Sequence, residues 1–168
     1  MKIIRADYTH LQEINNLFNQ AKHYFYLHHI DQWQDGYPDI ELLQQDIDSQ
    51  SGYVLLDYTK VIGYMFFAIY DEPSYRVIKN GHWLTDQKYG VIHRIVIDNT
   101  KKGQSLAAML LNYAENDLKS KNISSIRIDT HKNNLSMQNF LVKHHFQYCG
   151  DINLSDGSPR IAFEKILS

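Results

Sequence analysis

The stretch from Tyr89 to Asn116 constrains the fold of this chain more than any other part of the sequence. Between residues 91 and 97, five β-branched residues form an almost continuous apolar run, which is typical of a strand buried on both faces. After a short polar loop, apolar residues recur at helical spacing from Leu106 to Leu118. The stretch therefore predicts a buried strand, a loop around Gly103 and a helix.

The loop within this stretch has the composition of an anion-binding site. Lys101 and Lys102 supply positive charge, and Gly103, which lacks a Cβ, is followed by small residues that let a ligand approach the backbone. The first N–H groups of a helix have no partner within it, and the helix dipole adds partial positive charge there. The loop therefore favours phosphate or pyrophosphate. An ordinary strand, loop and helix with two solvated lysines is an equal alternative on the loop alone.

The sequence after this stretch predicts one more strand, a helix and two closing strands. From Ile123 to Thr130 apolar and polar residues alternate, as in a strand with unlike faces. Asn133 or Asn134 is suited to cap the helix that follows. The apolar face of that helix is formed by Met137, Phe140 and Leu141. The closing strands are expected at residues 146–150 and 160–166.

The first half of the chain predicts a strand and two helices. Residues 2–6 read as a strand, and Thr9 with Gln12 has the spacing of a capping box before a helix. Asp39 is placed to cap the second helix. This half contains no linker, repeat or low-complexity tract, so no domain boundary is expected within it.

A hairpin and an irregular segment complete the pattern. Residues 53–57 and 61–70 form a predicted hairpin around Thr59-Lys60. Residues 71–88 lack a clear pattern, so we expect an extended excursion around Trp83-Leu84. The predicted fold class is α/β, with a mixed, mostly antiparallel central sheet of about six to seven strands. Helices are expected on both faces of this sheet.

These motifs resemble the GNAT superfamily of N-acetyltransferases. In that family the turn before the helix follows the pattern Gln/Arg-x-x-Gly-x-Gly/Ala, and the matching residues here are Lys102, Ser105 and Ala107. Ser105 departs from the family's glycine. The later order is also similar, because an asparagine-led helix precedes a strand that opens with His145-Phe146, where the family has Gly-Phe. The phrases DQWQDGYP, YGVIHRI and RIDTH look like a bacterial subgroup of that family.

The resemblance implies a GNAT fold over residues 1–168 as a single acetyltransferase domain, with acetyl-CoA as cosubstrate. The implied pyrophosphate-binding residues are Lys102, Gly103, Gln104, Ser105, Leu106 and Ala107. The strand edge formed by Ile95, Val96 and Ile97 would pair with the pantetheine amides, and an N–H near Ile95 would stabilise the oxyanion. Asn134 matches the asparagine that touches the pantetheine arm. The implied reaction is direct acetyl transfer, in a ternary complex, to a primary amine of a small molecule or peptide.

His93 is the predicted general base. A protonated alkylamine cannot attack a thioester, and histidine titrates near neutral pH. The residue occupies the position where some relatives, arylalkylamine acetyltransferases among them, place a catalytic histidine. The alternative is a core histidine held by a neighbour. Asp129 and His131 are weaker candidates for the base, and Arg94 is expected to pair with a carboxylate such as Asp129.

The predicted general acid departs from the family. Many relatives protonate the leaving thiolate with a tyrosine, and the matching position here is Leu141. Tyr148 and Cys149 lie just downstream and are the predicted substitutes. The missing tyrosine also leaves open a second function class, a non-catalytic relative that binds coenzyme A for regulation or assembly.

The loop between the first two helices is the predicted acceptor site. Trp33, Asp35 and Tyr37 offer stacking to a cation and a counter-charge. Packing of Trp33 and Tyr37 onto the sheet is an equal alternative. The histidine pairs 28–29 and 144–145 do not predict a metal site, since adjacent side chains point apart.

Composition limits the remaining function classes. A chain of 168 residues with 43% hydrophobic residues suits one folded domain. Its net charge of −2 predicts neither nucleic acid nor an anionic membrane as a partner. The single cysteine excludes an internal disulfide and fits a reducing compartment, and the N-terminus resembles no signal peptide. A cytoplasmic monomer or homodimer is therefore expected.

Overall fold

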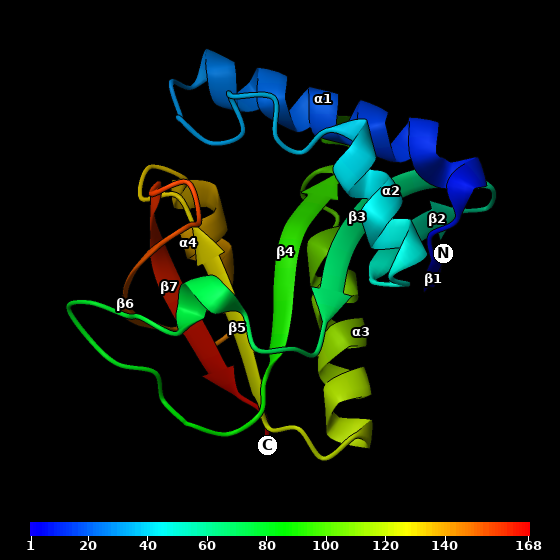
Figure 1. The fold of residues 1–168 in the computed structure, drawn as a ribbon. Helices are drawn as coiled ribbons and strands as arrows, with labels where there is room; N and C mark the ends of the chain where they lie inside the picture. Colours follow the sequence, from blue (N-terminus) through cyan, green and yellow to red (C-terminus); the bar gives the residue numbers. More distant parts are fainter. The chain divides into compact units, whose positions relative to one another are not determined.

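The computed structural model describes residues 1–168, and its strands form one seven-stranded mixed sheet in the order β1-β2-β3-β4-β5-β7-β6 (Figure 1). The strands are β1 (Lys2–Arg5), β2 (Gly52–Asp57), β3 (Lys60–Ala68), β4 (Gly90–Ile97), β5 (Ser125–Thr130), β6 (Gln147–Asn153) and β7 (Pro159–Ile166). The α-helices are α1 (Leu11–Leu27), α2 (Ile40–Asp48), α3 (Leu106–Ser120) and α4 (Leu135–Lys143). β4 and β5 pair in parallel, whereas β1-β2-β3 and β5-β7-β6 pair antiparallel. The predicted fold class and element order are confirmed.

The chain packs as two compact units. The first comprises Met1–Phe67 and His93–Tyr113, and the second comprises Ala68–Ile92 and Ala114–Ser168. β4 and α3 each give residues to both units. Each unit has its own buried core and is described by itself.

The first unit covers its strands with helices on both faces. α1 and α2 lie over one face (Figure 1). The buried residues of this face are Ile14, Phe18, Leu43, Ile47, Val54, Tyr64 and Val96. On the opposite face Tyr53 contacts Tyr113 of α3, with ring centroids 5.3 Å apart. Gly63 faces Leu110 of α3 there, and a Cβ at position 63 would lie only 2.8 Å from Ile97. Glycine thus permits the close approach of helix and sheet.

The helix starts test the predicted caps. Asp39 caps α2 by accepting from Leu42 N at 2.8 Å, which confirms that prediction. The capping box predicted for Thr9 and Gln12 is wrong. Asp7 caps the short 3-10 helix η1 (Tyr8–His10), and His10 closes the box by accepting from Asp7 N at 3.2 Å. α1 continues directly from this turn, so Thr9 lies inside the turn that Asp7 caps.

In the second unit, the segment between β3 and β4 lies against the sheet. Tyr75 of its short 3-10 helix η2 (Pro73–Tyr75) joins a core cluster with Ile152 of β6 and Ala162 of β7, and Trp83 packs against this cluster. Arg127 of β5 contacts the ring of Trp83 at 4.2 Å and donates to Glu164 at 3.1 Å. Glu164, fully buried, also accepts from Leu84 N at 2.5 Å. The expected excursion around Trp83-Leu84 is therefore fixed by a buried ion pair.

Candidate functional site

The backbone of β4 is irregular at Arg94. This residue has φ +49, a left-handed conformation that costs a non-glycine residue about 1–2 kcal/mol. Successive strand side chains normally point to opposite faces. Here both neighbours face one ring, since the His93 ring lies 5.7 Å from the Phe66 centroid and the Arg94 guanidinium 4.6 Å from it. We call this irregularity the bulge of β4, since a left-handed residue within a strand re-aims the side chains and N–H groups beside it.

The Arg94 guanidinium joins three elements of the first unit. It donates to Asp46 of α2 at 2.6 Å and to the hydroxyl oxygen of Tyr37 at 2.6 Å. Burial lowers the pKa of Arg94, but the nearby Tyr37 and Asp46 outweigh it, so its pKa is above the ordinary value. The predicted pairing of Arg94 with Asp129 is wrong. Asp129 accepts from the hydroxyl of Tyr75 at 2.7 Å instead.

The predicted base and strand edge lie around this bulge. His93 is half-buried on β4, next to Arg94. Ile95 and Ile97 are half-buried, while the side chain of Val96 belongs to the core beneath α1 and α2. Any contact of Val96 with a ligand would therefore be through its backbone. The catalytic role of His93 and the pantetheine contacts of residues 95–97 stay predictions.

The loop between β4 and α3 is anchored at its start. Asp98 caps the 3-10 helix η3 (Asn99–Lys101) by accepting from Thr100 N at 2.9 Å, and Asn99 N donates to Gln20 of α1 at 2.9 Å. After η3 residues 102–105 are exposed until Leu106, which is buried, begins α3. The anchored loop therefore presents four consecutive exposed residues, 102–105, at the start of a helix.

Ser105 explains why the related family uses glycine at this position. Its φ is +59, and that of Gly103 is +82. Left-handed backbone favours glycine, and a serine adopts it only at some cost. The carbonyl of Ser105 accepts from Met109 N at 3.2 Å, so the helix hydrogen bonds begin at this residue. Ser105 thus keeps the glycine-like geometry of the turn despite its side chain.

Lys102 supplies the positive charge of the loop. Its Nζ lies 3.9 Å from the ring centroid of Tyr24 in α1, and partial desolvation lowers its pKa. Gln104 is exposed and Ala107 is half-buried at the start of α3. With the free first N–H groups of a helix, this arrangement suits a pyrophosphate. Binding of coenzyme A by residues 102–107 stays a prediction.

The second unit holds the other predicted site residues. Asn134 is buried and accepts from Met137 N at 3.1 Å, which confirms it as the cap of α4. Tyr148 is half exposed, and its hydroxyl donates to Asp151 at 2.9 Å. Leu141, which matches the family's tyrosine, is fully buried. The pantetheine contact of Asn134 and the acid role of Tyr148 stay predictions.

Cys149 and the weaker base candidates are held by local contacts. Cys149 is buried, with Sγ 3.4 Å from the carbonyl of Gln147, and burial raises the pKa of its thiol to about 11. The thiol is therefore protonated at neutral pH, and its role as a proton donor stays a prediction. His131 is also buried and accepts from Asn133 N at 3.1 Å through Nδ1.

The predicted acceptor loop is fastened at several points. Trp33 packs edge-on against Phe18 and Phe25 of α1, each with centroids 5.4 Å apart, so its ring contacts are with this helix, whereas the packing alternative named the sheet. Asp35 is exposed and accepts from Tyr37 N at 3.3 Å. A contact of Trp33, Asp35 or Tyr37 with an acceptor stays a prediction.

Sequence reasoning missed two residues that organise this loop. Lys22 of α1 donates through Nζ to the carbonyls of Gly36 at 2.9 Å and Pro38 at 2.6 Å. Asp46 is buried beneath the loop as the partner of Arg94. Two features of the sequence could have indicated this pair. Asp46 stands beside the core residue Ile47, and Arg94 lies within a mostly apolar strand.

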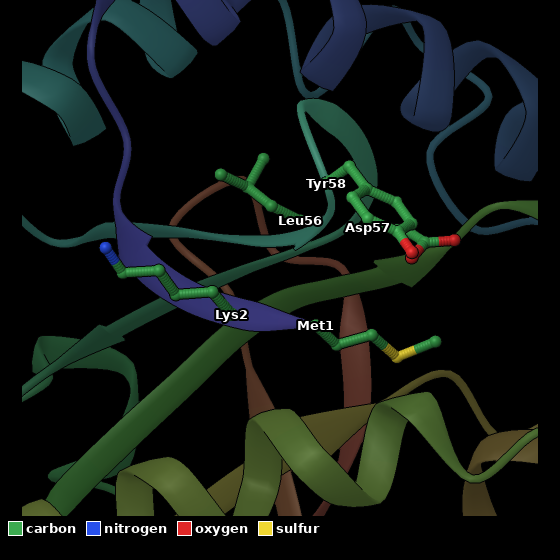
Figure 2. A pocket seen from close by; sticks show the side chains of 5 residues that line it. All are labelled: Met1, Lys2, Leu56, Asp57 and Tyr58. Atoms are coloured by element: carbon green, nitrogen blue, oxygen red, sulfur yellow. The ribbon is translucent and has the colours of Figure 1, made fainter.

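A pocket of about 290 Å³ lies elsewhere on the first unit (Figure 2). It is lined by Met1, Lys2, Leu56, Asp57 and Tyr58, at the edge formed by β1 and the β2–β3 turn. None of the predicted site residues lines it, so it carries no part of the candidate site. No three His, Cys, Asp or Glu side chains gather as metal ligands. None of the helices combines the length and apolarity that crossing a membrane requires.

Comparisons with known proteins agree with this geometry. The profile of the Acetyltransferase (GNAT) family matches residues 11–146. A GNAT family acetyltransferase from Streptococcus agalactiae 2603 is 32% identical over 99% of this chain and 95% of that chain, with a TM-score of 0.89. A putative acetyltransferase from Staphylococcus aureus MU50 is 23% identical over all of both chains, with a TM-score of 0.75.

A more distant structure shares the fold. It is an aminoglycoside 6'-N-acetyltransferase complexed with coenzyme A, 14% identical over 99% of this chain and 97% of that chain, with a TM-score of 0.66. A search of curated proteins gave no significant match. The family profile and the S. agalactiae relative confirm the resemblance seen in the sequence. The chain therefore belongs to the GNAT acetyltransferase family, whose members use acetyl-CoA as acetyl donor.

Proposed function

We propose that this acetyltransferase is an N-acetyltransferase acting on a primary amine of a small molecule or peptide. Transfer is direct, in a ternary complex with acetyl-CoA, and residues 1–168 act as one acetyltransferase domain. The observation that carries the proposal is the turn at residues 102–107. In this turn Ser105, at the glycine position of the family pattern, is exposed and left-handed directly before α3.

In this proposal the pyrophosphate is held mainly by backbone. The first N–H groups of α3 donate to its oxygens, and Lys102 adds charge. The backbone of residues 95–97 pairs with the pantetheine amides as an added strand would. Val96 supports this arrangement because its side chain is committed to the core.

The chemistry follows from the bulge in β4. His93 accepts the proton of the acceptor ammonium, and the freed amine attacks the thioester carbonyl. The N–H of Ile95, re-aimed by the left-handed Arg94, donates to the oxyanion of the tetrahedral intermediate. The carbon–sulfur bond then breaks, and the coenzyme A thiolate leaves and takes up the proton that the attacking nitrogen loses as the amide forms.

Thermal unfolding with acetyl-CoA tests the binding step. A ligand that binds only the folded protein at 100 times its Kd stabilises it by about 2.7 kcal/mol, so Tm should rise. Ser105→Ala should keep this rise, whereas Ser105→Pro should lose it, because proline holds φ near −65° and removes a donor. Since each variant's Tm without ligand reports its folding, an equal rise in both variants would contradict the backbone site.

An amine screen that follows release of the coenzyme A thiol tests turnover. Thiol release with a primary amine, and an acetylated amine by mass spectrometry, is the expected result. The buried Leu141 at the usual acid position favours the alternative, a non-catalytic relative that binds coenzyme A. Binding of acetyl-CoA without turnover of any amine, peptide amines included, would support that alternative.

A further inference from the structure

The buried guanidinium of Arg94, within the irregular strand β4, is the feature of the first unit that packing explains least. The Arg94 side chain is 7% exposed and that of Asp46 is 4% exposed, with 2.6 Å between Nη2 and Oδ1. A buried ion pair carries a large desolvation cost, and an apolar residue at this position of a mostly apolar strand would avoid it. The left-handed backbone of Arg94 adds strain. Packing alone therefore does not explain this residue.

The partners of Arg94 form a rigid chain of contacts. The other oxygen of Asp46, Oδ2, accepts from the buried hydroxyl of Tyr64 at 2.7 Å, so both carboxylate oxygens are fixed. The guanidinium lies against the Phe66 ring, and its other terminal nitrogen, Nη1, donates a hydrogen bond to the hydroxyl oxygen of Tyr37. The planar fork of arginine suits such a bridge, whereas a lysine ammonium is a single point charge.

Tyr37 is the one exposed member of this chain of contacts. It is 41% exposed and lies in the loop between α1 and α2. Lys22 holds the carbonyls on both sides of it, at Gly36 and Pro38. The phenol is thus presented to solvent in one orientation, fastened at its backbone by α1 and at its hydroxyl by β4. In the middle of this chain of contacts, Arg94 directly follows the proposed base, His93, in the sequence.

We propose that Arg94 is a positioning residue that fixes two parts of the acceptor site at once. Through its buried pair with Asp46 it holds the bulge of β4 beside His93. Through Tyr37 it holds the loop against which the acceptor amine binds, so Tyr37 determines how well an acceptor is oriented. This inference rests on the proposed function for its kinetic consequences, but its structural part does not require turnover.

Three variants separate these roles. Tyr37→Phe removes only the link to the loop. Arg94→Lys keeps the positive charge but cannot bridge Asp46 and Tyr37 together. Arg76→Lys is the matched control, since Arg76 forms an exposed pair with Asp71 at 2.8 Å, with both side chains 62% exposed.

Hydrogen exchange measured by mass spectrometry tests the structural part. In Tyr37→Phe, exchange in residues 31–39 should accelerate by about fivefold or more while residues 93–97 stay unchanged. Arg94→Lys should accelerate both segments, and Arg76→Lys neither. Unchanged exchange of residues 31–39 in both Tyr37→Phe and Arg94→Lys would overturn the proposal. If Arg94→Lys does not fold, Tyr37→Phe alone decides.

Kinetics test the positioning role against a merely structural one. Tyr37→Phe should raise the KM for the amine by about 10-fold with little change in kcat or in acetyl-CoA affinity. Arg94→Lys should also lower kcat and shift the acidic limb of the pH–rate profile. An amine KM within about twofold of wild type in both variants would overturn the proposal. If wild type turns over no amine, the proposed function fails, whereas the exchange data still decide whether Arg94 fixes the loop.

Discussion

The hydroxyl of Tyr64 donates to Asp46 at 2.7 Å in the core of the first unit, where Tyr64 is fully buried. Burial, reinforced by the Asp46 carboxylate, raises the pKa of this phenol, so it remains a donor. The bond helps to satisfy a buried carboxylate that already pairs with Arg94. The two contacts together fix α2 against the sheet.

Tyr64→Phe should lower the free energy of unfolding by about 1–3 kcal/mol, because a buried charged acceptor loses a donor. Tyr8→Phe is a matched control. Tyr8 also donates to an aspartate, Asp48, at 2.7 Å, but it is 53% exposed and should cost about 0.5 kcal/mol or less. Urea unfolding of both variants measures the difference. If both variants lost the same free energy of unfolding, burial of the Tyr64–Asp46 hydrogen bond would not increase its contribution to stability.

Ser105→Gly should raise the free energy of unfolding by up to about 1 kcal/mol, because glycine adopts φ +59 without a Cβ clash. Ser136→Gly is the control with the opposite sign. Ser136 is exposed within α4, and glycine there should lower stability by about 0.5 kcal/mol. Thermal or urea unfolding distinguishes the two. If Ser105→Gly destabilises as Ser136→Gly does, the serine is not held left-handed in solution.

Cys149 should react slowly in the folded protein. Burial raises the pKa of its thiol from 9.0 to about 11, so little thiolate is present at pH 8. Alkylation by iodoacetamide at pH 8, followed by mass spectrometry, should be at least about 10²-fold slower than in urea. Rapid modification of the folded protein would contradict this burial.

The same shift predicts a pH dependence of stability. A group whose pKa is higher in the folded state stabilises below its unfolded pKa, and this contribution is lost as pH rises through the folded value. Between pH 9 and 11 the free energy of unfolding of wild type should therefore fall more steeply than that of Cys149→Ala. Urea unfolding at several pH values in this range measures both slopes. Parallel slopes would contradict the prediction.

His93→Gln tests the base in the proposed reaction. Glutamine keeps a polar group of similar size but cannot accept the proton, so kcat/KM should fall by roughly 10²–10⁴-fold. Acetyl-CoA affinity should be nearly unchanged. In wild type kcat/KM should rise with pH, since only the neutral imidazole accepts a proton, and this acidic limb should disappear in the variant.

A control and an alternative accompany this test. His82→Gln changes an exposed loop histidine and should leave the pH–rate profile intact. If His93→Gln retains most of the rate and the acidic limb, His93 is structural, and Asp129 or His131 becomes the candidate base.

Sequence alone determined the features that depend on neighbouring residues. The apolar run of β4 and the helical spacing of α3 were predicted because strand and helix periodicity are local. Asp39 was predicted as a cap, and Asn134 was one of two candidates with Asn133, because a capping side chain reaches an N–H three residues on in its own helix. At the first helix the same reasoning failed, since Asp7 and Thr9 are both capping residue types and only one takes the position.

Tertiary structure alone decided the features that depend on distant residues. Arg94 pairs with Asp46, 48 positions away, because α2 covers the face of the sheet into which the bulge turns the guanidinium. Trp33 packs on Phe18 and Phe25 because the loop folds back over α1. A strand pattern specifies that a side chain leaves the sheet, but not which helix lies over it, so these partners follow only from the packing of the whole unit.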